Sequence, residues 1–268
     1  MNSIGIMQGR LSPSSDGRLQ FFPKDWVAEF ALAKELGFNH LQWFLDRDLP
    51  NFDPINDLWS QTDELKKIDQ GRAILPISSI DCGTYGLFGP EAKITLRDFP
   101  KLFPAASGRL STKVISLALL EKNAPKSETE KREAGQTITT LADLAAPFGL
   151  RLALETEMPV QELISFIGSL NRPNVGVGFD IGNNTSYGFD CPADIRRLGS
   201  RIIEVHCKDR KVGGSQSVLL GTGDGAFADC FAALKEIGYS GAYTLQAWRG
   251  QDYLNDAKTQ LAFVKKTL

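Results

Sequence analysis

The sequence alternates between short runs of β-branched and aromatic residues and longer amphipathic stretches along its whole length. Such short apolar runs are typical of strands buried in a parallel sheet, and the amphipathic stretches are typical of helices that cover the sheet. The predicted strands are 3–7, 40–44, 73–80, 113–119, 150–155, 175–180, 202–207 and 242–246. The predicted helices are 23–37, 57–70, one within 91–107, 127–147, 159–170, 192–199, 226–237 and 253–267.

This pattern predicts an α/β fold, a single-domain (β/α)8 TIM barrel, because such barrels have eight strand–helix units in about 250 residues. A doubly wound open sheet is the alternative, but it usually has fewer strands and a GxGxxG turn after the first one. The segment GIMQGRLSP after the first predicted strand does not supply that turn. No Pro/Gly/Ser-rich linker divides the chain, so we expect residues 1–268 to form one domain.

Composition restricts the partners and the compartment. With 42% hydrophobic and 23% charged residues and a net charge of −2, the chain has no basic surplus to attract nucleic acid or an anionic membrane. The amino terminus lacks the features of a signal peptide, and no stretch approaches the roughly 20 apolar residues that span a bilayer. The 4 cysteines form no CxxC pair. We expect a cytoplasmic protein with reduced thiols, and the sequence is compatible with a homo-oligomer.

Polar residues gather at the ends of the predicted strands, where the loops of a (β/α)8 barrel form its active site. They are Gln42, Asp81, Glu121, Glu155, Glu157, Asp180, His206, Lys208, Asp209, Gln246, Trp248 and Arg249. Residues two apart on a strand share a face, so a His206 that points into the barrel mouth takes Glu204 and Lys208 with it. Cys207 would then face the helices, and Glu204 would lie one layer deeper as a paired structural charge.

Glu155, Asp180 and His206 end three consecutive predicted strands. Two carboxylates and an imidazole suit a divalent cation such as Mn, Mg, Co or Zn. Each residue alone has an ordinary explanation, because an acidic group at a strand end can cap a helix and a histidine can be a hydrogen-bonded core residue. Their coincidence on neighbouring strands predicts one divalent metal ion.

Several segments together resemble the xylose isomerase-like TIM barrel family. They are GIMQGRLSP, LALETEMP, GVGFDIGNN, VHCKDR with the following GGSQSVLLGTGDGAF, and GYSGAYTLQ. The family contains sugar and sugar-phosphate isomerases and epimerases and, more distantly, endonuclease IV. The resemblance covers essentially the whole chain. It implies an enzyme that acts on a small sugar or sugar phosphate through a metal-stabilised enediolate.

The resemblance also implies roles for individual residues. The metal ligands would be Glu155, Asp180, His206 and, from the eighth strand, Gln246. Glu155 would be the base, and Lys208 would contact the oxygens of the substrate and take part in catalysis.

The sequence departs from the family pattern at Gln246 and Gln42, where many members have glutamate. A glutamine oxygen can ligate a hard metal but cannot accept a proton at neutral pH. With only Glu155 and Asp180 charged, the ligand set would have a charge of −2, and we expect weaker retention of the metal.

Three hypotheses about the chemistry of the site therefore stay open. Glu155 acts as a single base, which favours an aldose–ketose isomerase; another carboxylate replaces the second base; or the chain is a catalytically altered relative that only binds sugar. The candidates for the second base are Glu121, Glu157 and Asp81. An AP-site endonuclease is disfavoured, because those enzymes use several histidines and this chain has only 2, and because it has Asn183 where their Asp-x-x-His feature has histidine.

Other residues near the predicted mouth suggest substrate contacts. A basic cluster of Lys208, Arg210, Lys211 and Arg249 is suited to a sugar phosphate or a sugar acid, although such clusters are often only solvated. The further substrate-binding candidates are Asn183, Trp248 and Glu121.

Two more patterns have alternative explanations. Residues 221–225, GTGDG, could bind phosphate through backbone amides or form a tight turn in which Asp224 caps the next helix. Trp43, Phe44 and Trp248 could form an apolar wall for a sugar ring or pack at the rim.

Overall fold

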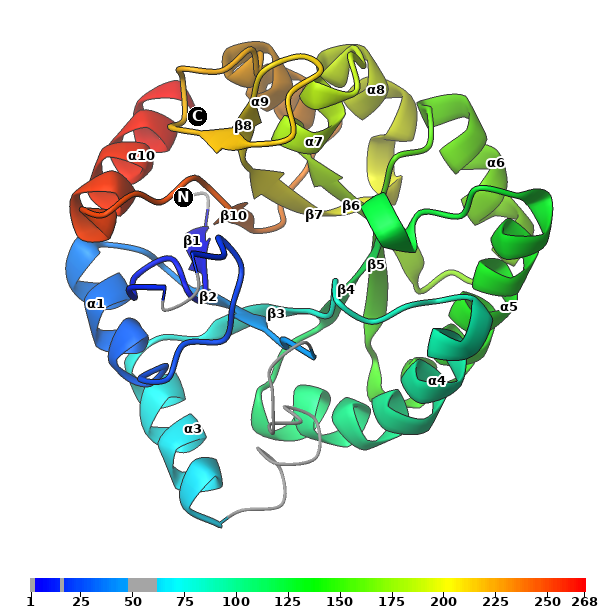
Figure 1. Cartoon of the computed structure of the whole chain (residues 1–268), viewed down its shortest axis with the longest axis horizontal. Coiled ribbons are helices and arrows are strands. Elements are labelled where there is room, and N and C mark those ends of the chain that lie inside the picture. Colours follow the sequence, from blue (N-terminus) through cyan, green and yellow to red (C-terminus); the bar gives the residue numbers. More distant parts are fainter. Residues whose placement is uncertain (1–2, 15–16, 48–61) are drawn as a thin grey trace.

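The computed structural model describes residues 3–14, 17–47 and 62–268, and it forms a closed parallel barrel (Figure 1). The barrel strands are β1 (Ile4–Met7), β2 (Leu41–Phe44), β3 (Ile77–Asp81), β4 (Val114–Leu119), β5 (Arg151–Thr156), β6 (Val175–Asp180), β7 (Ile202–Cys207) and β10 (Tyr243–Leu245). They follow one another around the barrel in chain order, and β10 closes it against β1. The predicted (β/α)8 barrel is confirmed.

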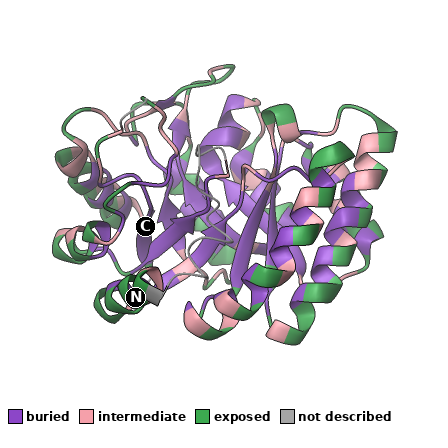
Figure 2. Cartoon of the chain, turned by 60° about the horizontal axis from the view of Figure 1, so that its bottom comes forward, coloured by how far each residue is buried: buried purple, intermediate pink, exposed green. Residues whose placement is uncertain are grey.

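Helices surround the barrel, with their buried faces against the strands and their exposed faces outward (Figure 2). They are α1 (Ala28–Leu36), α3 (Thr62–Ile74), α4 (Gly89–Pro104), α5 (Glu128–Ala145), α6 (Val160–Leu170), α8 (Cys191–Leu198), α9 (Phe227–Glu236) and α10 (Tyr253–Thr267). Short helical turns are η1 (Ala105–Arg109), η2 (Glu121–Asn123), η3 (Ala146–Phe148) and η4 (Gly199–Arg201). None of the helices in the described residues is long and apolar enough to cross a membrane.

Two elements near the mouth were not expected from the sequence. A short helix, α7 (Ile181–Ser186), follows β6 directly, and a small antiparallel ribbon, β8 (Asp209–Arg210) with β9 (Ser217–Val218), follows β7. The predicted strand 73–80 is wrong at its start, because α3 continues to Ile74 and Pro76 then favours extended backbone before β3. Residues 57–61 of the predicted helix 57–70 lie outside the described residues.

The two faces of the barrel strands differ in chemistry. Trp43 points outward and packs on Trp26, with ring centroids 5.0 Å apart, and on Phe22 and Phe30. Trp43 is therefore part of the layer between strands and helices, and the alternative that it forms a wall for a sugar ring is wrong. Cys207 also lies in this apolar layer, as expected, and the 4 cysteines are all free and buried.

The inner face of the barrel is polar at the level just below the mouth. Gln42, Ser79, Ser116 and Glu204 are all buried there and hydrogen-bond with one another. The barrel thus places a polar floor directly beneath the strand ends.

Candidate active site

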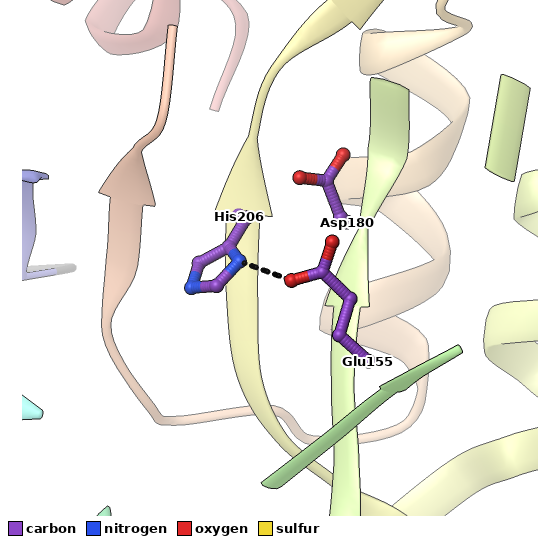
Figure 3. Close-up of side chains that lie close together, drawn as sticks. All are labelled: Glu155, Asp180 and His206. Carbon is purple, nitrogen blue, oxygen red and sulfur yellow. Dashed lines mark hydrogen bonds and ion pairs between the residues drawn. The ribbon is translucent and has the colours of Figure 1, made fainter. Parts of the chain in front are cut away.

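Glu155, Asp180 and His206 meet at the ends of β5, β6 and β7 (Figure 3). One ligand atom of each lies within 4.8 Å of those of the other two. The relative exposures are 5% for Glu155 and 0% for Asp180 and His206. His206 Nδ1 is 3.2 Å from Glu155 Oε2. The fold therefore brings together the three residues that the sequence singled out as metal ligands.

Asp180 is oriented by the helix that follows it. Its Oδ1 accepts the backbone N–H of Asn183 at 2.8 Å and caps α7. Among the described residues, Asp180 Oδ2 accepts no hydrogen bond, and it forms an ion pair with Lys208 Nζ at 2.8 Å. The buried Asp180 Oδ2 is thus paired with the ammonium of Lys208, and a divalent cation would also satisfy this preference for positive charge. The residues present fit a divalent ion.

Asn183 connects the members of the site. Its Nδ2 donates to Glu155 Oε1, and its Oδ1 is 3.4 Å from Lys208 Nζ. The sequence predicted Asn183 as a substrate contact. In the structure its side chain reaches from the short α7 to Glu155 and Lys208 and positions both.

Burial and neighbouring charges shift the pKa values of Glu155 and His206 in opposite directions. Burial raises the pKa of Glu155, but His206, Lys208 and Asn183 outweigh it and leave that pKa below its usual value. Burial lowers the pKa of His206, but Glu204 and Glu155 outweigh it and hold that pKa well above its usual value. Without a metal, the imidazole is therefore positive and Glu155 is negative.

Gln246 lies beside the buried carboxylate of Asp81. Its Nε2 donates to Asp81 Oδ2 at 2.9 Å, and its Oε1 accepts from Gln20 Nε2 at 3.3 Å. Burial raises the pKa of Asp81 to about 6; His206 opposes this shift and Glu155 adds to it. Sequence reasoning missed Gln20, because nothing in the loop after β1 indicates that it reaches over the mouth.

Asp81, Glu155 and Gln246 line a cavity of about 190 Å³ at the barrel mouth. The other described lining residues include Gln20, Glu121, Asn183, Lys208 and Arg210. A wider recess of about 620 Å³ shares Gln20, Glu121, Lys208 and Arg210 with this cavity, and Phe44, Trp248 and Arg249 also line it. The predicted substrate contacts thus lie around one connected opening.

Two of the predicted substrate contacts, Arg249 and Arg210, differ in the hydrogen bonds that their guanidinium groups make. Arg249 donates to the carbonyls of Gly9 and Ser12 at 2.7 Å and of Arg18 at 2.8 Å, so it secures the loop after β1. In contrast, Arg210 Nε is buried and has no hydrogen-bond partner in the described part of the chain.

The backbone amides of the GTGDG segment already bind a side chain of this protein. The amides of Gly221, Gly223 and Gly225 donate to the carboxylate of Asp209 at 2.9, 2.8 and 3.1 Å. A Cβ at Gly223 would lie 2.0 Å from Asp209 Oδ1, so only glycine fits there. The alternative of a phosphate site in this segment is wrong. The expected cap is also wrong, because Asp224 pairs with Lys211 Nζ at 3.0 Å.

Replacing Asp209 with alanine should lower the free energy of unfolding by about 3 kcal/mol, because three amides lose a buried, charged acceptor. Denaturant unfolding measures this change. The matched control is Asp224→Ala, which removes an exposed ion pair and should cost less than about 1 kcal/mol. Equal losses in the two variants would contradict the structural role given to Asp209.

The fold and the site together define a (β/α)8 barrel protein with buried carboxylates and a histidine at its mouth. The model of the family described as xylose isomerase-like TIM barrel matches residues 30–267. The chain therefore belongs to the xylose isomerase-like TIM barrel family, as its motifs indicated.

Individual relatives agree with this assignment. An L-ribulose-5-phosphate 3-epimerase of Salmonella heidelberg (strain SL476) is 25% identical over 235 residues, which cover 83% of this chain and 82% of the relative. The fold is similar to D-allulose 3-epimerase from Methylomonas sp. in complex with D-allulose, with a TM-score of 0.77, 19% identity and coverage of 100% and 97%. It is also similar to the IOLI protein with a bound zinc atom, with a TM-score of 0.76, 17% identity and 99% coverage of both chains.

Proposed function

We propose that this chain is a divalent-metal-dependent sugar epimerase in which Glu155 and Asp81 exchange protons with the carbon beside the carbonyl of a ketose. The observation that supports it is the Asp81 carboxylate beside Gln246, in the cavity that Glu155 also lines. The names of the relatives, L-ribulose-5-phosphate 3-epimerase and D-allulose 3-epimerase, agree with this reaction class.

The metal would be held by Glu155, Asp180 and His206, with Gln246 Oε1 as the fourth ligand. When bound, a divalent cation supplies Lewis acidity that polarises the carbonyl and makes the neighbouring proton more acidic. The donor set of two carboxylates and one imidazole is compatible with Mn, Mg, Co or Zn.

The chain's own residues perform the proton transfers. Glu155 has a lowered pKa and is ionised at neutral pH, so it can remove the proton from one face of the substrate carbon. Lys208, within the same cavity, can orient the substrate oxygens as an ammonium donor.

Epimerisation requires a proton donor on a second face, and Gln246 cannot supply one. Asp81 comes from β3, two strands from Glu155, and its side chain contacts Gln246. The pKa of about 6 lets Asp81 carry a proton in part of the molecules near neutral pH. Glu121 is exposed, and Glu157 pairs with Lys126 Nζ at 3.2 Å, so Asp81 is the best placed of the three carboxylates.

We further propose a phosphorylated or otherwise acidic ketose as the substrate. Arg210 Nε and Ser217 Oγ are both buried without a hydrogen-bond partner among the described residues, and both residues line the recess next to the cavity. A phosphate oxygen would satisfy both groups. This choice agrees with the name of the relative L-ribulose-5-phosphate 3-epimerase.

Elemental analysis of the purified protein, followed by NMR of ketoses and ketose phosphates in D₂O, tests the proposal. An epimer carrying deuterium at the inverted carbon is the expected product. An aldose product would instead favour a single-base isomerase. Binding of sugar without any exchange or conversion would favour the catalytically altered, sugar-binding alternative.

Replacing Gln246 with glutamate should tighten Mn²⁺ binding by about 10-fold, because a fourth ligand gains a full negative charge. Titration of the metal-free protein with Mn²⁺ measures the change. Gln136→Glu on the exposed face of α5 adds the same net charge far from the site and should leave the affinity unchanged. An unchanged affinity in Gln246→Glu would show that Gln246 is not a ligand.

A further inference from the structure

The polar floor beneath the candidate metal site contains a carboxylate with no assigned role. Glu204 lies on β7 two residues before His206, so both side chains point into the barrel. It is only 3% exposed. We propose that Glu204 is a positioning residue that holds the imidazole of His206 with Nδ1 toward Glu155 and Asp180, and that it supplies negative charge to a divalent cation there.

The contacts of His206 show which of its two ring nitrogens faces the candidate ligand atoms and which faces the polar floor. Nδ1 lies 3.2 Å from Glu155 Oε2, at the level of the ligand atoms (Figure 3). Nε2 lies 3.5 Å from Glu204 Oε2, on the floor of the site. A ligand nitrogen must offer its lone pair, so coordination through Nδ1 places the imidazole proton on Nε2.

That proton needs an acceptor, and Glu204 is the group able to take it. The other close neighbour of Nε2 is the amide nitrogen of Gln42, at 2.8 Å. This nitrogen donates to Glu204 Oε1 at 2.9 Å and could donate to Nε2 only in the other tautomer, so the proposal requires the Gln42 amide to move off Nε2 when Nδ1 binds the metal. Metal-bound histidines commonly donate their second N–H to a carboxylate, which fixes the tautomer and the ring orientation.

The charge of Glu204 also needs compensation. Its remaining partners, Gln42, Ser79 and Ser116, are neutral. Within the described ranges, His206 is the only group with which Glu204 forms an ion pair. A buried carboxylate with neutral partners favours positive charge nearby. Glu204 would thus add negative charge beside a ligand set that itself carries −2.

This inference rests on the proposed metal site, and Glu204→Gln tests it because the amide keeps the size and removes the charge. Titration with Zn²⁺ alone should show a 10- to 100-fold weaker affinity than the wild type. The matched control is Asp98→Asn, a buried carboxylate on α4 that pairs with Arg97, and its zinc affinity should equal that of the wild type. Thermal unfolding of all three metal-free proteins verifies that they are folded.

A spectroscopic measurement separates positioning from a purely structural role. The chain has 2 histidines, so ¹⁵N-histidine NMR of the zinc-loaded protein resolves both imidazoles. His40 bonds to the hydroxyls of Ser3 and Thr244 and is the internal reference. His206 should show a zinc-bound Nδ1 and a protonated Nε2, and the Nε2–H signal should shift in Glu204→Gln.

The outcomes distinguish this inference from the proposed function. Wild-type zinc affinity in Glu204→Gln, or a zinc-bound Nε2 in the wild type, would overturn the role of Glu204 and leave the metal site standing. A wild-type protein that binds no zinc would overturn the role of Glu204 and the proposed metal site together. Weaker zinc binding with the expected tautomer would support both.

Discussion

Replacing Glu155 with glutamine is expected to reduce turnover of the ketose substrate by about 10³-fold while leaving the fold intact. The amide has the size of the carboxylate and can keep the hydrogen bond from Asn183 Nδ2 through its oxygen. It cannot accept a proton, so the first proton transfer is lost. Steady-state kinetics on the substrate found by the NMR screen measures the loss, and thermal unfolding verifies the fold.

The control for this change is Glu157→Gln, two residues further along the chain. Glu157 pairs with Lys126 Nζ at 3.2 Å and lies partly exposed at the rim, so its loss should change turnover less than 3-fold. Elemental analysis of Glu155→Gln shows whether metal is retained, which separates loss of the base from loss of the ligand. Full activity in a metal-loaded Glu155→Gln would show that Glu155 is not the base.

Replacing Asp81 with asparagine is expected to reduce epimerisation by 10²- to 10³-fold, because the second proton donor is lost. Glu155 still removes and returns the proton on its own side. One epimer should therefore continue to exchange its proton with D₂O although almost none is inverted. Exchange without inversion, followed by NMR, is the sign that two groups act on two faces.

The same assay tests Glu121 as the alternative second proton donor. Glu121 is exposed at the rim of the cavity, and Glu121→Gln should leave the ratio of exchange to inversion unchanged. If Glu121→Gln lost inversion while Asp81→Asn kept it, the roles would be reversed. If inversion survived in both variants, neither carboxylate would be the second proton donor.

The main parts of the site were predictable because strand ends converge in a barrel. Glu155, Asp180 and His206 end consecutive strands, and parallel strands in a closed barrel point their carboxyl ends at one mouth. The period of two along a strand also placed Glu204 below His206. These predictions needed only the order of elements and the side-chain alternation.

Predictions failed where a loop or a packing direction decided the outcome. The GTGDG segment binds Asp209, because the ribbon of β8 and β9 brings that carboxylate to its amides. Trp43 faces the helices, because its neighbour Gln42 takes the inward position on β2. The start of β3 was misplaced, because α3 runs on to Ile74.

The sequence by itself determined the barrel, the family and the three candidate metal ligands, because these follow from the order of elements and from local motifs. Only the tertiary structure placed Asp81 against Gln246 and Glu204 against His206. Asp81 and Gln246 are 165 positions apart, and their contact depends on closure of the barrel and on the loop that brings in Gln20. The consequence of Gln246 for catalysis therefore depends on long-range contacts, which residue types and spacing do not encode.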